Sequence, residues 1–148
     1  MKKIAILFIM LVSMAVLTAC VGNAADTSSG NKTTIEMELD KNYDDSDPFV
    51  NAKLFCVSED LDAISAEGTL AMDGESGILE VKNNRTDEIL WSDIWEGTVK
   101  SETFSISLEN LKKEDEYAVY FTGTKINHAA IAITFESDFV QEREKPLP

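Results

Sequence analysis

Histidine, cysteine and proline are all scarce in this chain, and their scarcity excludes several kinds of chemistry. The 148 residues include one histidine, two cysteines and three prolines. A Ser-His-Asp triad needs a histidine held between a nucleophile and an orienting acid, and the sequence has no Gly-x-Ser-x-Gly motif. The single histidine, His128, follows Asn127 at a predicted turn, so we interpret it as a solvated residue. We predict no catalytic residues and no enzymatic activity.

Basic residues are also few, because 13 Lys and Arg stand against 27 Asp and Glu, for a formal net charge of −14. Nucleic-acid binding depends on Lys and Arg contacts to phosphates, so we expect no nucleic-acid partner. A surface this acidic is repelled by an anionic bilayer. Its simplest interpretation is a solvated, soluble surface, and the alternative is a cationic partner or a bound metal.

The longest apolar run lies at the start of the chain. Lys2 and Lys3 precede the run from Ile4 to Val16, in which Ser13 is the only polar residue. A basic start followed by an apolar core of this length is typical of a secretory signal peptide. As a helix the run would reach about 20 Å, which is too short for a bilayer core of about 30 Å.

The run ends in Leu17-Thr18-Ala19-Cys20, which resembles the bacterial lipobox at all four positions. The resemblance implies that the Cys20 sulfur receives a diacylglyceryl group and that the chain is cleaved after Ala19. The mature protein would then be anchored by its lipid at the extracytoplasmic face of the cell membrane. The alternative is an ordinary secretory signal in which a cysteine happens to follow an alanine.

Lipid on Cys20 would leave the second cysteine, Cys56, without a partner in the chain. Its neighbours Leu54, Phe55 and Val57 are apolar, so Cys56 is interpreted as a small buried residue. A disulfide scaffold is excluded, although an intermolecular bridge stays open. A Cys56–His128 pair also stays open, but apolar surroundings disfavour a thiolate.

The sequence divides into four parts. We predict a signal peptide over 1–19, the lipid-acceptor cysteine and a flexible tether over 20–33, a β domain over 34–140 and a frayed tail over 141–148. The tether is small, polar and without periodicity. Its span should be about 20 Å on average and about 45 Å when fully extended, which keeps the domain close to the membrane. Loss of Lys2 and Lys3 leaves 11 basic residues against 27 acidic ones, a net charge of −16.

The predicted domain shows the two-residue alternation of β-strands. Ile35, Met37 and Leu39 alternate with acidic residues, and similar patterns separated by turn residues run to the end of the domain. Strands are expected over 34–40, 70–72, 79–81, 88–95, 103–108, 117–121 and 130–136. The segment 50–57 fits a buried strand better than a helix begun at Asp47-Pro48, and 58–67 suggests a single helical turn. These features predict an all-β antiparallel sandwich, immunoglobulin-like or jelly-roll-like, with about seven or eight strands.

Four motifs in this domain resemble those of small sandwich domains in Gram-positive lipoproteins of unknown function. They are Gly77-x-Leu79-x-Val81, a strand bearing Trp91, Phe104-x-Ile106-x-Leu108 and Glu116-Tyr117-x-Val119-x-Phe121. The segment 77–137 that holds them is also similar to eukaryotic GOLD-type cargo sandwiches. The resemblance implies the sandwich fold and assigns no functional residues.

The densest acidic stretch follows the first predicted strand. Its oxygen-bearing residues at positions one, three, five and seven of a calcium loop are Asp40, Asn42, Asp44 and Ser46. An EF-hand is rejected, because Asp45 replaces the required Gly and Asn51 stands where a bidentate Glu belongs. A weak, irregular Ca²⁺ site stays open at Asp40, Asn42, Asp44 and Asp47, against a solvated acidic turn. No other cofactor is expected.

Two tryptophans on one predicted strand give the candidate ligand site. Trp91, Asp93 and Trp95 share one face of an extended segment. Exposed rings beside a carboxylate suit the binding of a sugar or a peptide, whereas buried rings would pack between two sheets. We expect a non-enzymatic accessory lipoprotein that binds a protein or small ligand. The alternatives are a carbohydrate- or peptide-binding protein that uses these tryptophans and a structural subunit of a membrane-associated complex.

Overall fold

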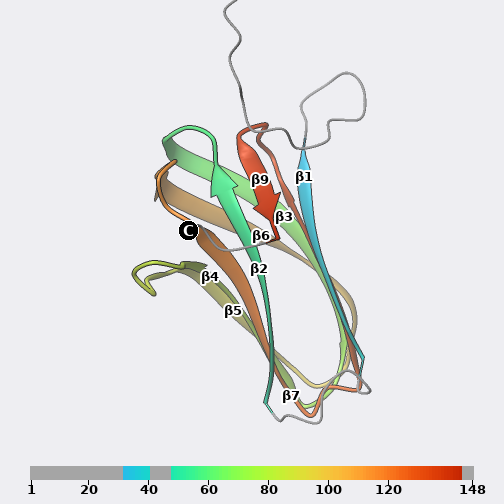
Figure 1. Ribbon diagram of the computed structural model, residues 1–148. Helices are drawn as coiled ribbons and strands as arrows, with labels where there is room; N and C mark the ends of the chain where they lie inside the picture. Colours follow the sequence, from blue (N-terminus) through green and yellow to red (C-terminus); the bar gives the residue numbers. More distant parts are fainter. Residues whose placement is uncertain (1–31, 41–47, 145–148) are drawn as a thin grey trace, which may run out of the picture.

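The computed structural model describes residues 32–40 and 48–144, and these residues form two packed antiparallel sheets (Figure 1). Nine strands and no helix occur in the described part, which confirms the predicted all-β sandwich and adds one strand to the upper expected number. The strands are β1 (Thr33–Asp40), β2 (Phe49–Val57), β3 (Leu61–Asp73), β4 (Ser76–Asn83), β5 (Ile89–Glu96), β6 (Val99–Leu111), β7 (Tyr117–Thr124), β8 (His128–Phe135) and β9 (Val140–Arg143).

Each sheet combines strands that are distant in the sequence. The four-stranded sheet has the order β1-β8-β3-β6, and the five-stranded sheet has the order β5-β4-β7-β2-β9. All adjacent strands are antiparallel. The sandwich therefore has two long edges, one formed by β5 and β6 and called the β5–β6 edge. The other, called the β1–β9 edge, is formed by β1, by β9 and by the first half of β2, which pairs with β7 but not with β9.

The alternation read from the sequence determines which side chains form the core. In β1, Ile35, Met37 and Leu39 are buried and the acidic residues between them are exposed. The same alternation in the other strands directs apolar side chains into the space between the sheets. The largest fully buried side chains include Tyr117, Phe55, Phe121 and Phe135. Phe55 packs against both Tyr117 and Phe135, so it joins the two sheets.

Two ambiguous segments are strands. The preference for a strand over 50–57 is confirmed by β2. The single helical turn suggested within 58–67 is wrong, because β3 begins at Leu61 and runs for 13 residues. Its inward positions include Ala66 and Gly68, whose small side chains weaken the apolar alternation on which the prediction depended.

Part of the segment 141–148, which was expected to be frayed, is a strand. Gln141, Glu142 and Arg143 belong to β9 and pair with the end of β2. Val140 is buried and anchors the strand. The pairing uses backbone hydrogen bonds, and polar side chains are usual on an edge strand, so the sequence pattern gave no sign of it.

The chain enters the sandwich beside β9. The Thr33 hydroxyl donates to the Val140 carbonyl at 2.6 Å, and the Lys32 ammonium lies 2.7 Å from the Glu136 carboxylate. The predicted signal peptide, Cys20 and nearly all of the tether lie outside the described residues. No helix long and apolar enough to cross a membrane occurs in the part of the chain that the structure describes.

Candidate functional site

Trp91 and Trp95 pack inside the β5–β6 edge. Both rings contact Phe104 of the opposite sheet, with ring centroids 5.6 Å apart for Trp91 and 5.2 Å apart for Trp95. Trp91 is half-buried and Trp95 is 5% exposed. The Trp95 indole N–H donates to Glu102 at 3.0 Å. These rings join the two sheets and do not present a pair of open stacking faces.

Asp93 is exposed between the two tryptophans. Its carboxylate accepts the backbone N–H of Ile94 at 2.8 Å. It is therefore free to meet solvent, but the flanking rings are turned toward the core. The structure brings the three predicted residues onto one strand without forming the open platform that a sugar ring needs.

A glycine makes room for the aromatic contact. Gly68 of β3 is the direct partner of Phe104 of β6, and a Cβ at residue 68 would lie 2.2 Å from the Phe104 ring. The ring therefore lies across the glycine, which is a known way to fill the space that a strand glycine leaves. The Phe104 position thus depends on Gly68 as well as on the tryptophans.

The predicted calcium loop is described only at its first residue. Asp40 is exposed at the end of β1, whereas Asn42, Asp44 and Asp47 lie outside the described residues. In the sheet register, Asp40 of β1 lies opposite His128 of β8, and His128 lies opposite Asp73 of β3 on its other side. Within residues 32–40 and 48–144, no three His, Cys, Asp or Glu residues are grouped closely enough to hold a metal ion.

His128 and Cys56 lie in different sheets. His128 is exposed at the start of β8 in the four-stranded sheet, near the turn where the sequence placed it. Cys56 is half-buried in β2 of the five-stranded sheet, with its Sγ 3.9 Å from the Arg143 guanidinium. Cys56 alternates with the inward-facing Phe55 and Val57, so it points away from the core and from the other sheet. The structure does not bring the two residues together as a catalytic pair.

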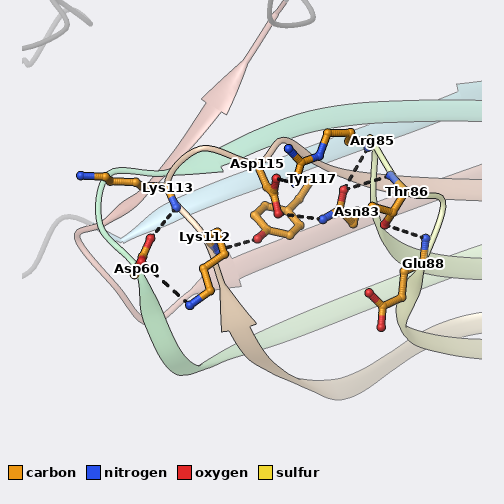
Figure 2. Close-up of polar contacts among 9 residues, drawn as sticks. All are labelled: Asp60, Asn83, Arg85, Thr86, Glu88, Lys112, Lys113, Asp115 and Tyr117. Atoms are coloured by element: carbon orange, nitrogen blue, oxygen red, sulfur yellow. Dashed lines mark hydrogen bonds and ion pairs between the residues drawn. The ribbon is translucent and has the colours of Figure 1, made fainter.

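A buried polar cluster joins the β4–β5 and β6–β7 connections (Figure 2). The Asn83 amide donates to one Asp115 oxygen at 3.0 Å, and its own oxygen accepts the backbone N–H groups of Arg85 and Thr86. The other Asp115 oxygen lies 2.5 Å from the Arg85 guanidinium, a charge contact rather than an aligned hydrogen bond. Asp115 is 6% exposed, so the pairing offsets part of the cost of burying its charge.

Tyr117 extends this cluster toward Lys112 (Figure 2). The backbone N–H of Lys112 donates to the phenolic oxygen at 2.6 Å. Burial raises the pKa of Tyr117 above its ordinary value, and this effect exceeds the opposite effect of the hydrogen bond from Lys112. Nearby, Asp60 accepts the backbone N–H of Lys113 at 3.0 Å. These polar groups fix loops to each other, so the cluster is structural.

Two hollows lie on opposite sides of β1, at Glu36, Met37 and Glu38. The outer hollow, of about 410 Å³, has small side chains from β3 and β8 as its floor. The inner hollow, of about 490 Å³, lies between β1 and the strands β2 and β9. These are concave surfaces next to an unpaired strand edge, which is a geometry that can accept an extended chain.

Sequence reasoning missed both the Asp115 cluster and the concave surroundings of β1. In the sequence, Asn83-Asn84 indicates only a turn, and the adjacent acids Asp115-Glu116 before a predicted strand are the only other signal. The two halves of the cluster are 32 residues apart, and their contact depends on the sheet order. No local pattern could have shown that they meet.

Comparison with models of known protein families gives a match to this chain. The model of a family described as a domain of unknown function (DUF4624) matches residues 19–147. No match to a curated protein was found. Because the family model covers most of the 148 residues, the chain belongs to the DUF4624 family of domains of unknown function.

Proposed function

We propose that this protein is a membrane-anchored extracytoplasmic lipoprotein whose sandwich acts as a non-enzymatic binding module. The observation that carries the anchoring is the tetrapeptide Leu17-Thr18-Ala19-Cys20 at the end of a signal-like apolar run. A diacyl anchor at Cys20 holds an acidic domain at a surface that would otherwise repel it. Two acyl chains suffice for stable attachment, whereas a single chain gives only reversible binding.

The entry of the chain into the fold supports a short tether. Lys32 and Thr33 are held against Glu136 and Val140, so the folded domain begins 12 residues after the predicted lipid. That length averages about 20 Å in a flexible chain. The module would therefore meet partners that are themselves at, or near, the membrane surface.

The free edge of β1 favours a binding role in a protein complex. Its unpaired backbone and its two flanking hollows are suited to another polypeptide. The same observation favours the second candidate function, a structural subunit of a membrane-associated complex. The sugar-binding alternative has less support, because Trp95 is buried.

Anchoring is tested by replacing the acceptor thiol. Full-length protein should fractionate with membranes, and mass spectrometry of its N-terminal peptide should find a diacylglyceryl thioether on Cys20. Cys20→Ala should lose this modification and move to the soluble or unprocessed fraction, whereas the control Cys56→Ala should behave as wild type. Processed Cys20→Ala protein that remains with membranes would overturn the proposal.

A further inference from the structure

We propose that the free edge of β1 binds an extended, basic segment of a partner protein by strand addition. The segment's alternate side chains would occupy the two hollows that flank Glu36, Met37 and Glu38. This inference rests on the proposed binding function and names the chemistry of the partner.

The main-chain groups of β1 provide the first part of the argument. β1 pairs with β8 through eight positions on one side, and no described strand pairs with its other side. An edge strand of eight residues spans about 26 Å and presents a row of unpaired N–H and C=O groups. A peptide of six to eight residues in extended form can satisfy that row.

The outer hollow gives side chains from the added strand a place to rest. Ala130 and Ala132 of β8 form its floor together with Ala71 of β3. Their methyl groups leave depth beside the larger Glu36 and Glu38 on β1. A side chain from the added strand would lie over these alanines with its polar end near the two carboxylates.

The inner hollow receives the side chains that point the other way. Asn51 and Lys53 of β2 line it with Glu142 of β9. Because successive side chains of a strand point to opposite faces, one set would enter each hollow. The Lys53–Glu142 pair in this hollow is 3.7 Å apart and exposed, so a bound chain can displace it at little cost.

Charge determines the kind of segment that fits. Four carboxylates line the two hollows, against two cationic side chains. The carboxylates are those of Glu36, Glu38, Glu142 and Glu144, and the cations are Lys53 and Arg143. Within the described residues, Glu36 and Glu38 have no ion pair or side-chain hydrogen bond. They lie two residues apart on one face, so a Lys or Arg placed between them relieves their mutual repulsion.

The same charges disfavour a second copy of this chain as the occupant. Pairing two β1 edges would place Glu36 and Glu38 of one copy against acidic residues of the other. Directly opposed like charges destabilise strand pairing. A basic segment from a different protein is therefore the better complement.

The test uses full-length protein, purified from whichever cell fraction contains it, and a fluorescent eight-residue peptide that alternates Lys with Val. Two isomers of this peptide carry N-methyl groups at either the odd or the even positions. In strand addition only one set of N–H groups faces β1, so one isomer should lose about tenfold or more in affinity and the other about twofold or less. Equal loss from both isomers would overturn strand addition. Spermine is the control for charge alone, because it is a cation without a peptide backbone.

Protein variants then locate the peptide. Glu36→Lys with Glu38→Lys should weaken binding by about tenfold or more, because it reverses the charge at the hollows. The matched control Glu67→Lys with Glu109→Lys makes the same charge change on the same sheet and should alter binding by about twofold or less. Glu36→Gln with Glu38→Gln serves if the charge reversal impairs folding. Ala132→Leu should also weaken peptide binding, because the larger side chain fills the outer hollow. Ser107→Leu makes a similar change elsewhere on the same sheet and is its control.

Besides equal loss from the two isomers, four further results would overturn the inference: no peptide binding, equal binding of a Glu-Val peptide, equal effects of the two charge reversals, or spermine binding as well as the peptide. Light scattering that shows a dimer abolished by the β1 substitutions would instead identify a second copy as the occupant. The anchoring experiment is separate. If Cys20 proves unmodified but the peptide binds β1, the proposed binding surface is retained and the proposed membrane anchoring is rejected.

Discussion

At the β5–β6 edge, aromatic rings from both sheets fill the space between the strands, whereas at the β1–β9 edge the space is left as a hollow lined by charged side chains. Trp91 and Trp95 meet Phe104 on the first side. Glu36, Lys53 and Glu142 surround the second. All four of these strands lie at the edge of a sheet, so the two edges differ in the side chains between the sheets and not in strand pairing. The comparison indicates that aromatic packing joins the sheets at the β5–β6 edge, and the β1–β9 edge, which lacks that packing, is the one at which we propose binding.

The largest loss of stability should come from Phe104→Ala, at the β5–β6 edge. The change removes the ring that joins both tryptophans to the four-stranded sheet, so we expect a loss of about 3–5 kcal/mol in the free energy of unfolding. Urea unfolding followed by tryptophan fluorescence measures it. Thr103→Ala, at a neighbouring exposed position, is the control. A loss below about 1 kcal/mol would show that the rings do not stabilise this edge.

Gly68→Ala should have the next largest effect. The added methyl group would collide with the Phe104 ring, and we expect a loss of about 1–3 kcal/mol in the free energy of unfolding. The same change in a Phe104→Ala background should cost much less, because the ring is absent. Equal costs in the two backgrounds would mean that the contact between Gly68 and Phe104 is not the cause.

Tyr117 lies in the core between the two edges. Its titration should therefore not depend on the side chains of the β5–β6 edge or on those of the β1–β9 edge. Its folded pKa is raised above 10.0. The protonated form therefore stabilises the fold fully below the ordinary pKa, and this contribution is lost as pH rises through the raised value. Tyr117→Phe should lose about 1 kcal/mol near neutrality through the missing hydrogen bond from Lys112.

The pH dependence is measured by urea unfolding of Tyr117→Phe and wild type at about pH 8 and about pH 11, on either side of the ordinary tyrosine pKa. The wild type should lose stability more steeply between these values. Both proteins retain every other titratable side chain, so the difference between their losses of stability reports Tyr117 alone. Parallel decreases in stability would be inconsistent with a buried, titrating Tyr117.

The smallest effect on stability should come from Glu36→Gln with Glu38→Gln at the β1–β9 edge. These exposed carboxylates have no partner within the described residues, so the free energy of unfolding should change by about 0.5 kcal/mol or less. Any gain should shrink at high salt, because salt already screens the repulsion between them. A destabilisation above about 1 kcal/mol would make this edge structural and weaken the contrast with the β5–β6 edge.

Local sequence patterns predicted the fold class because alternation alone decides which side chains are buried. Ile35, Met37 and Leu39 are buried as that pattern requires. The beginning of β3 and the strand β9 escaped prediction, since small or polar residues at Ala66, Gly68 and Gln141 carry little alternation. Their strand conformation is determined by backbone pairing, of the beginning of β3 with β6 and of β9 with β2.

The site was less accessible to sequence reasoning, because it depends on contacts between distant strands. Whether Trp95 is buried depends on Phe104 lying opposite it, and the Phe104 position in turn depends on Gly68. Likewise, nothing in the local pattern shows that β1 is an edge strand, since this follows from the sheet order. Alternation identified the exposed face of β1 but gave no sign of its unpaired edge.

The position of β1 in the chain has a mechanical consequence. The predicted tether continues directly into β1, and the proposed partner pairs with the free side of the same strand. Tension between membrane and partner would then pass along β1 from one attachment to the other without crossing the core. The rest of the sandwich would bear little of that load, and β8 would support β1 through its eight paired positions.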